Sequence, residues 1–97
     1  MAFISIEQNS VTTESVVYTS TGVTTVIIGF AIAPTSGGNA IVNAKKGAAH
    51  LIKGLTITAG TANSAIQPGQ KVVLTPGQTL SVSSDTAVDV VISGYTE

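Results

Sequence analysis

The chain has 97 residues, of which 43% are hydrophobic and 9% are charged, with a net charge of −1. Soluble domains usually carry about 25% charged residues, so we expect small polar side chains or other protein to cover this surface. The length predicts a single domain. The sequence contains no cysteine, which excludes a disulfide, a thiolate metal site and a thiol nucleophile.

The longest apolar stretch, residues 26–34, is about half as long as a membrane helix. The first residues lack the basic leader and apolar core of a secretory signal. We therefore expect no membrane partner and a soluble product that is made and used without export through the secretory route. Four lysines, no arginine and four scattered aromatic residues also argue against a nucleic-acid partner.

Glycine and proline divide the chain into short runs rich in valine, isoleucine and threonine, which is typical of an all-β sandwich. We predict a single antiparallel β-sandwich, jelly-roll-like or immunoglobulin-like, of about eight short strands. Residues 1–10 form an N-terminal arm or edge strand, and residues 11–97 form the sandwich domain. The predicted strands cover residues 3–7, 15–20, 24–33, 39–45, 50–58, 71–75, 79–84 and 88–95.

Two Pro-Gly pairs predict tight turns, because proline sets φ near −65° and glycine accepts a positive φ. The pair Pro76-Gly77 should join residues 71–75 and 79–84 into a hairpin, and Pro68-Gly69 should make a similar corner. Alternation predicts which side chains of the later strands point inward. These are Leu55, Ile57, Val72, Leu74, Leu80, Val82, Val88, Val90 and Ile92.

The strand over residues 24–33 is apolar on both faces. One face, with Val26, Ile28, Phe30 and Ile32, is the expected core stripe. The other face has no charge and mostly small groups, so either a loop of the same chain or another subunit covers it. That second face holds Thr25, Ile27, Gly29, Ala31 and Ala33.

Two further features suggest contact with other chains. The N-terminal run, with Phe3 on one side and Ile4 and Ile6 on the other, either edges its own sheet or reaches a neighbour, which we favour. All four lysines lie at positions 45–71 and the acids lie outside that span, so they either interleave on folding or pair across an interface. The candidate contact residues are Phe3, Ile4, Ile6, Ile27, Ala31, Ala33, Lys45 and Lys46.

No catalytic constellation is apparent. His50 is the single histidine, and its apolar context is typical of a packed or capping residue. Asp85 and Asp89 flank a turn, where an aspartate usually forms the turn itself. We expect no enzyme activity, cofactor, metal or small-molecule substrate. Tyr18 and Tyr95 leave a carbohydrate- or receptor-binding module as the alternative from a different class.

The ordered strands resemble small β-sandwich virion proteins of tailed bacteriophages. The resemblance rests on Val17-Tyr18-Thr19, the run 25–30, the run 50–57, residues 71–74 with 77–82, and the closing run 88–95. It implies a non-enzymatic capsid decoration, or cement, protein on the outer capsid surface of a virion, often a homotrimer at local three-fold positions. The resemblance also implies synthesis in the host cytoplasm. The implied partners are the major capsid protein and the chain itself. A tail, neck or fibre-base subunit is the alternative within the same class.

Overall fold

The computed structural model describes residues 2–64 and 71–97, and its regular structure consists of nine strands. No helix occurs in these two ranges, so none there could cross a membrane. The strands are β1 Ala2–Val11, β2 Ser15–Thr19, β3 Thr25–Pro34, β4 Ala40–Lys46, β5 Ala49–Ile57, β6 Asn63–Ser64, β7 Val72–Leu74, β8 Thr79–Ser84 and β9 Val88–Thr96.

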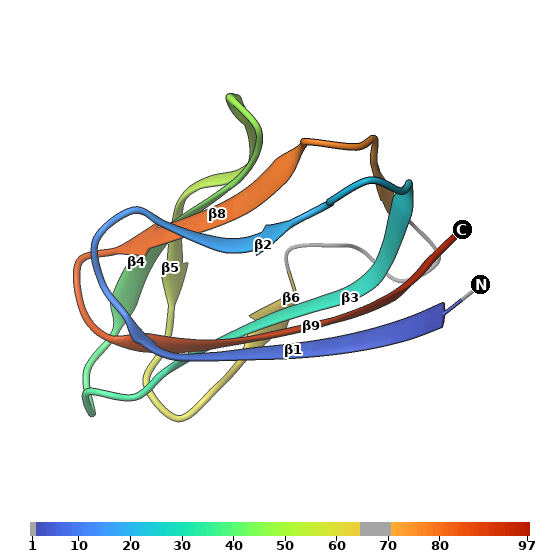
Figure 1. The fold of residues 1–97 in the computed structure, drawn as a ribbon. Helices are drawn as coiled ribbons and strands as arrows, with labels where there is room; N and C mark the ends of the chain where they lie inside the picture. Colours follow the sequence, from blue (N-terminus) through green and yellow to red (C-terminus); the bar gives the residue numbers. More distant parts are fainter. Residues whose placement is uncertain (1, 65–70) are drawn as a thin grey trace.

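The strands form two facing antiparallel sheets, which confirms the predicted β-sandwich (Figure 1). In the five-stranded sheet the order is β1–β9–β3, and β6 and β7 both pair with the remaining side of β3. In the four-stranded sheet the order is β2–β8–β4–β5. Strand β1 pairs with β9 of its own chain, so residues 2–11 are an edge strand and do not leave the domain as an arm.

The hydrophobic core lies between the sheets and takes side chains from both of them. Phe30 of β3 is its largest fully buried side chain, and Leu74 and Leu80 are fully buried in opposite sheets. All the inward positions predicted for the later strands belong to the core or pack against it. Alternation along a strand therefore predicted these faces correctly, because period-two patterning is a local property of an extended chain.

The predicted hairpin of residues 71–75 and 79–84 is wrong. Strand β7 pairs with β3, while β8 has β2 and β4 on its two sides, which leaves β8 no edge for β7. The tight turn itself is present, with a 3.0 Å hydrogen bond from Gln78 N to Thr75 O and a φ of 90° at Gly77. It carries the chain from one sheet to the other. The corner expected at Pro68-Gly69 lies outside the described residues.

A β-bulge in β3 changes which side chains enter the core. Its register with β9 shifts between Ile27 and Gly29, and an extra residue reverses the alternation. Ile27 is therefore fully buried in the core with Phe30, whereas Ile28 is 53% exposed. The expected stripe of Val26, Ile28, Phe30 and Ile32 is wrong for Ile28, and Val26 is buried outside the core cluster.

The bulge requires a glycine in the neighbouring strand. Gly94 of β9 lies opposite Ile27, and a Cβ at Gly94 would overlap the carbonyl oxygen of Val26 and approach the Cα of Ile27 to 3.1 Å. Both obstacles are backbone atoms, which cannot move away as the end of a flexible side chain can. Gly94 thus allows β3 and β9 to approach closely at the bulge.

We predict that Gly94→Ala lowers the free energy of unfolding by about 2–3 kcal/mol, in the range of overpacked sites. Gly38→Ala is the matched control, because no atom lies within 4 Å of its added Cβ and no left-handed φ is required there. The control should stay within about 0.5 kcal/mol of the wild type. Urea unfolding followed by circular dichroism measures both, and equal midpoints for the two variants would contradict the proposed role of Gly94.

Candidate interaction surface

The outer face of the five-stranded sheet carries a row of apolar residues that crosses four strands. Phe3 of β1 lies opposite Tyr95 of β9, which lies opposite Val26 of β3, which in turn lies opposite Val73 of β7. Phe3 is 77% exposed, and its ring meets that of Tyr95 edge to face with the ring centres 6.5 Å apart. Val73 is also exposed.

The next positions on this face are small or apolar as well. Ser93 lies over Gly29, where a Cβ would overlap the serine hydroxyl oxygen. Beyond them Val91 lies opposite Ala31, and both side chains are exposed. Together with Ile28, which the bulge turns outward, these residues form what we call the apolar face: Phe3, Ile28, Ala31, Val73, Val91 and Tyr95.

Charged residues stand at the margins of the apolar face. Glu7 lies opposite Val91, and Asp89 lies opposite Ala33. Asp89 is held by the backbone, since its Oδ1 accepts a 3.1 Å hydrogen bond from Ser10 N, where φ is 56° at the bulge of β1. Lys71 directly precedes β7 at the opposite margin.

The structure separates the apolar candidate contact residues into three groups. Phe3 and Ala31 lie exposed on the apolar face, with Ala33 half-buried beside them. Ile4 and Ile6 pack against the rim of the core. Ile27 belongs to the core itself, so its expected place on the outer face is wrong. Ile28 takes that place. The sequence did not predict this, because the alternation of residue types along a strand does not show where a bulge occurs.

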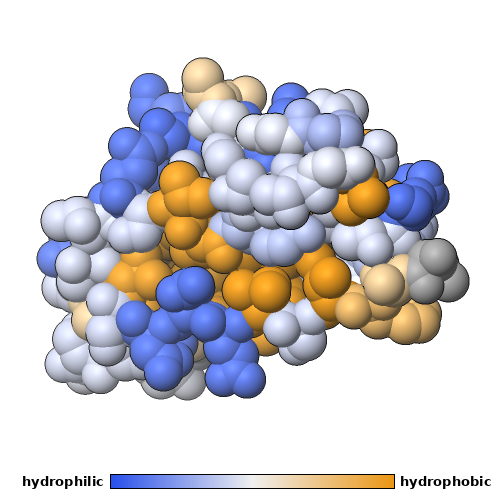
Figure 2. Space-filling model, viewed as in Figure 1, coloured by the Kyte–Doolittle hydropathy of each residue, from blue (hydrophilic) through white to orange (hydrophobic). Residues whose placement is uncertain are grey.

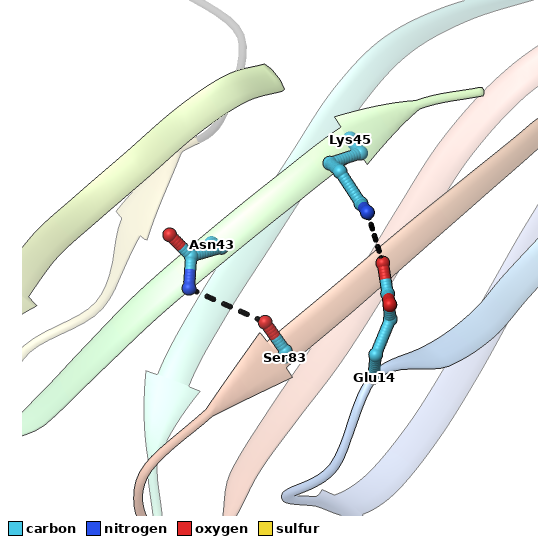
Figure 3. A network of polar contacts seen from close by, with 4 residues as sticks. All are labelled: Glu14, Asn43, Lys45 and Ser83. Atoms are coloured by element: carbon cyan, nitrogen blue, oxygen red, sulfur yellow. Dashed lines mark hydrogen bonds and ion pairs between the residues drawn. The ribbon is translucent and has the colours of Figure 1, made fainter. Parts of the chain in front are cut away.

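Lys45 and Lys46 lie on β4, in the other sheet, away from these residues. Lys45 forms an ion pair with Glu14, the one ion pair among the described residues (Figure 3). Folding thus brings at least one of the lysines to an acid of the same chain. It does not leave that lysine free for a neighbouring subunit.

The outer face of the four-stranded sheet is organised by polar contacts. Asn43 donates from Nδ2 to Ser83 Oγ at 3.3 Å (Figure 3). Its Oδ1 accepts a 2.8 Å hydrogen bond from Gly54 N. Gly54 has a φ of 67° and lies where the register of β4 and β5 shifts. Asn43 therefore links the irregular edge strand β5 to β4 by a hydrogen bond. The outer face of the four-stranded sheet differs in this way from the apolar face of the five-stranded sheet.

The remaining polar candidates have structural roles. Asp85 accepts a 2.8 Å hydrogen bond from Ile41 N of β4, so it links the turn after β8 to a strand distant in sequence. His50 is exposed on β5, so of the two expected roles, packed or capping, the packed one is wrong. Within residues 2–64 and 71–97, no three or more histidine, aspartate or glutamate residues gather as a metal site would require.

The hydroxyl of Tyr18 belongs to a hydrogen-bonded network with two buried hydroxyl side chains. It lies 3.1 Å from Thr25 Oγ1, which lies 2.9 Å from Ser20 Oγ, and Ser20 donates a 2.6 Å hydrogen bond to the carbonyl of Val23. One direction satisfies all three hydroxyls: Tyr18 donates to Thr25 and Thr25 donates to Ser20. Tyr18 is thus part of the framework, and Tyr95 packs against Phe3.

No protein-family model, curated protein or solved structure matches this chain. The resemblance to phage virion proteins accordingly rests on the order and spacing of strands and turns.

We predict that Lys45→Met changes the free energy of unfolding by less than about 1 kcal/mol, because ion pairs with an exposed partner contribute little. Glu14 is 55% exposed in this pair. Lys53→Met serves as the control, since Lys53 is exposed and forms no ion pair among the described residues. Any difference between the variants should shrink in 0.5 M salt. A loss above about 2 kcal/mol for Lys45→Met alone would contradict this view.

Proposed function

We propose that this chain is a non-enzymatic structural subunit that docks on a larger assembly through its apolar face. The specific role proposed is capsid decoration, in which the chain binds the major capsid protein on the outer surface of a virion. The observation that carries the proposal is the exposed apolar face, which spans β1, β9, β3 and β7 and bears charges at its margins. Extended apolar patches on small domains are typical of interaction sites.

Burial of this face supplies a sufficient driving force. Removal of apolar surface from water contributes roughly 25 cal/mol per Å², so a contact of a few hundred Å² contributes several kcal/mol. Binding to the assembled lattice, and not to dissociated capsid subunits, stabilises the lattice by mass action. Many equivalent copies bound to one shell would multiply this stabilisation of the lattice.

The low charge of the chain supports an apolar docking contact over an ionic one. Screening by salt acts on exposed ion pairs and leaves apolar contacts intact. Lys45 is one of the few charged residues, and it forms an ion pair with Glu14 of the same chain.

A tail, neck or fibre-base subunit is the alternative role, and it would use the same face. Copy number separates the two roles, because a capsid lattice offers hundreds of equivalent positions and a neck or tail offers a few rings of them. Quantitative mass spectrometry of purified particles measures this number. Hundreds of copies per particle would support decoration, whereas three, six or twelve would place the chain in the neck or tail.

We predict that Ile28→Ser weakens attachment to particles at least tenfold, because it removes an exposed isoleucine from the apolar face. Ile41→Ser is the matched control, since Ile41 is 49% exposed against 53% for Ile28 but belongs to β4 of the other sheet. Co-sedimentation with particles assembled without this chain measures attachment at 0.05 and 0.5 M salt. Equal loss with both variants, or release of the wild type by salt, would contradict docking through this face.

A further inference from the structure

The four lateral edges of the sandwich are not protected equally. Exposed strand edges invite pairing with other chains, and proteins usually shorten them, bulge them or place lysine on them. Three of the edges here carry such features. Strands β6 and β7 have two and three residues, β2 has five residues with a register shift, and β5 carries Lys53 beside the irregularity at Gly54.

The fourth edge, β1, lacks this protection over most of its length. Strand β1 has ten residues without proline or lysine, and its pairing with β9 is regular from Ala2 to Gln8. The register shift comes only after Gln8, at the end that leads to β2. Within the part of the chain that the structure describes, no strand pairs with the other side of this regular segment. That side is a row of backbone donors and acceptors about 23 Å long, at 3.3 Å per residue.

The core is also incompletely covered along this edge. Ile4 and Ile6 pack against the core but remain half-buried, because no further strand of residues 2–64 or 71–97 lies beside them. Figure 2 shows hydrophobic residues gathered in a band along β1 and between the two layers on this side of the molecule. A strand added to β1 would satisfy the backbone and cover this rim at once.

We infer that the free edge of β1 pairs antiparallel with β1 of a second copy of this chain, about a two-fold axis at Ser5. Ser5 is the centre of the regular segment 2–8, so pairing about it uses every regular residue. Ser5 then lies opposite Ser5 of the other copy, and Ile4 lies opposite Ile6. The two half-buried rims meet and cover each other.

The segment is self-complementary in its apolar residues, because Ile4 and Ile6 face each other across the axis, and this favours a second copy as the occupant. Its single charge does not oppose that pairing. Glu7 is the one charged residue of β1, and in this register it lies opposite Phe3 of the other copy. The two Glu7 residues are four positions apart along the strand, about 13 Å, beyond the screening length of about 8 Å at physiological salt. A two-fold contact of this kind closes on itself and gives a dimer.

This inference does not rest on the proposed function, because it is argued from the backbone edge of β1, which shares only Phe3 with the apolar face. In the dimer the two five-stranded sheets become one continuous sheet. The axis is perpendicular to that sheet, so both apolar faces lie on the same side.

Cysteine cross-linking tests the register, and the chain has no native cysteine to interfere. Opposite Cα atoms in an antiparallel pair are about 4.5–5.5 Å apart, within the range of a disulfide. We expect Ser5→Cys to form a covalent dimer under mild oxidation. Ser93→Cys is the control, because Ser93 lies on the same face but one strand further in. Cross-linking of Ser93→Cys in place of Ser5→Cys would indicate face-to-face association and overturn the inference.

Sedimentation equilibrium tests the dimer without cross-links. The wild type should show twice its chain mass of 9.7 kDa, and Ser5→Lys should raise the dissociation constant at least tenfold by placing two lysines opposite each other. Thr19→Lys, which adds the same charge to exposed Thr19 on edge strand β2, should leave the dimer intact. Unchanged circular dichroism spectra would show that both variants fold.

A monomer or a trimer at 100 μM wild-type chain would overturn the edge pairing, whatever the particle experiments show. Conversely, if the Ile28→Ser variant still attaches to particles, docking through the apolar face is contradicted. A measured dimer would still support edge pairing in that case. The two proposals therefore fail separately.

Discussion

The close approach of β3 and β9 at the bulge is the constraint on which the rest of the structure depends. Ile27 and Phe30 lie three residues apart, so strict alternation would send them to opposite faces. The register shift between Ile27 and Gly29 brings both into the core with Ile32, and Gly94 leaves room for the displaced backbone. Full burial of such a side chain contributes about 1.5–3 kcal/mol to stability. Because the bulge and Gly94 allow Ile27 and Phe30 to be buried together, they account for much of the stability that β3 contributes.

The same irregularity creates the surface that we propose for docking. The bulge turns Ile28 outward beside the small residues Gly29 and Ala31, and Phe3, Tyr95 and Val73 extend the surface across the neighbouring strands. The other sheet differs, because Asn43 and Lys45 make polar contacts on its outer face, although Val16 and Ile41 of that sheet are also exposed. The bulge in β3 therefore shapes both the core and the apolar face. As a result, the sandwich has one side suited to an apolar partner.

The proposed edge and face contacts run in perpendicular directions and can operate together. Pairing through β1 would join two copies in the plane of the sheet, while the apolar face would bind a partner above that plane. Because both faces of the dimer lie on one side, a single lattice could engage them simultaneously. Linked binding of this kind strengthens attachment through effective concentration, without any additional contact within each copy.

The sequence by itself determined the class of fold, the approximate positions of the main strands, the inward residues of the later strands and the tight turn at Pro76-Gly77. These depend on alternation and on the φ preferences of neighbouring residues, which are local properties of the chain. Only the tertiary structure decided that β7 leaves β8 to pair with β3, that Ile27 and Ile28 exchange faces, and that Lys45 meets Glu14. Each of these depends on the register between strands distant in sequence, which no local pattern encodes.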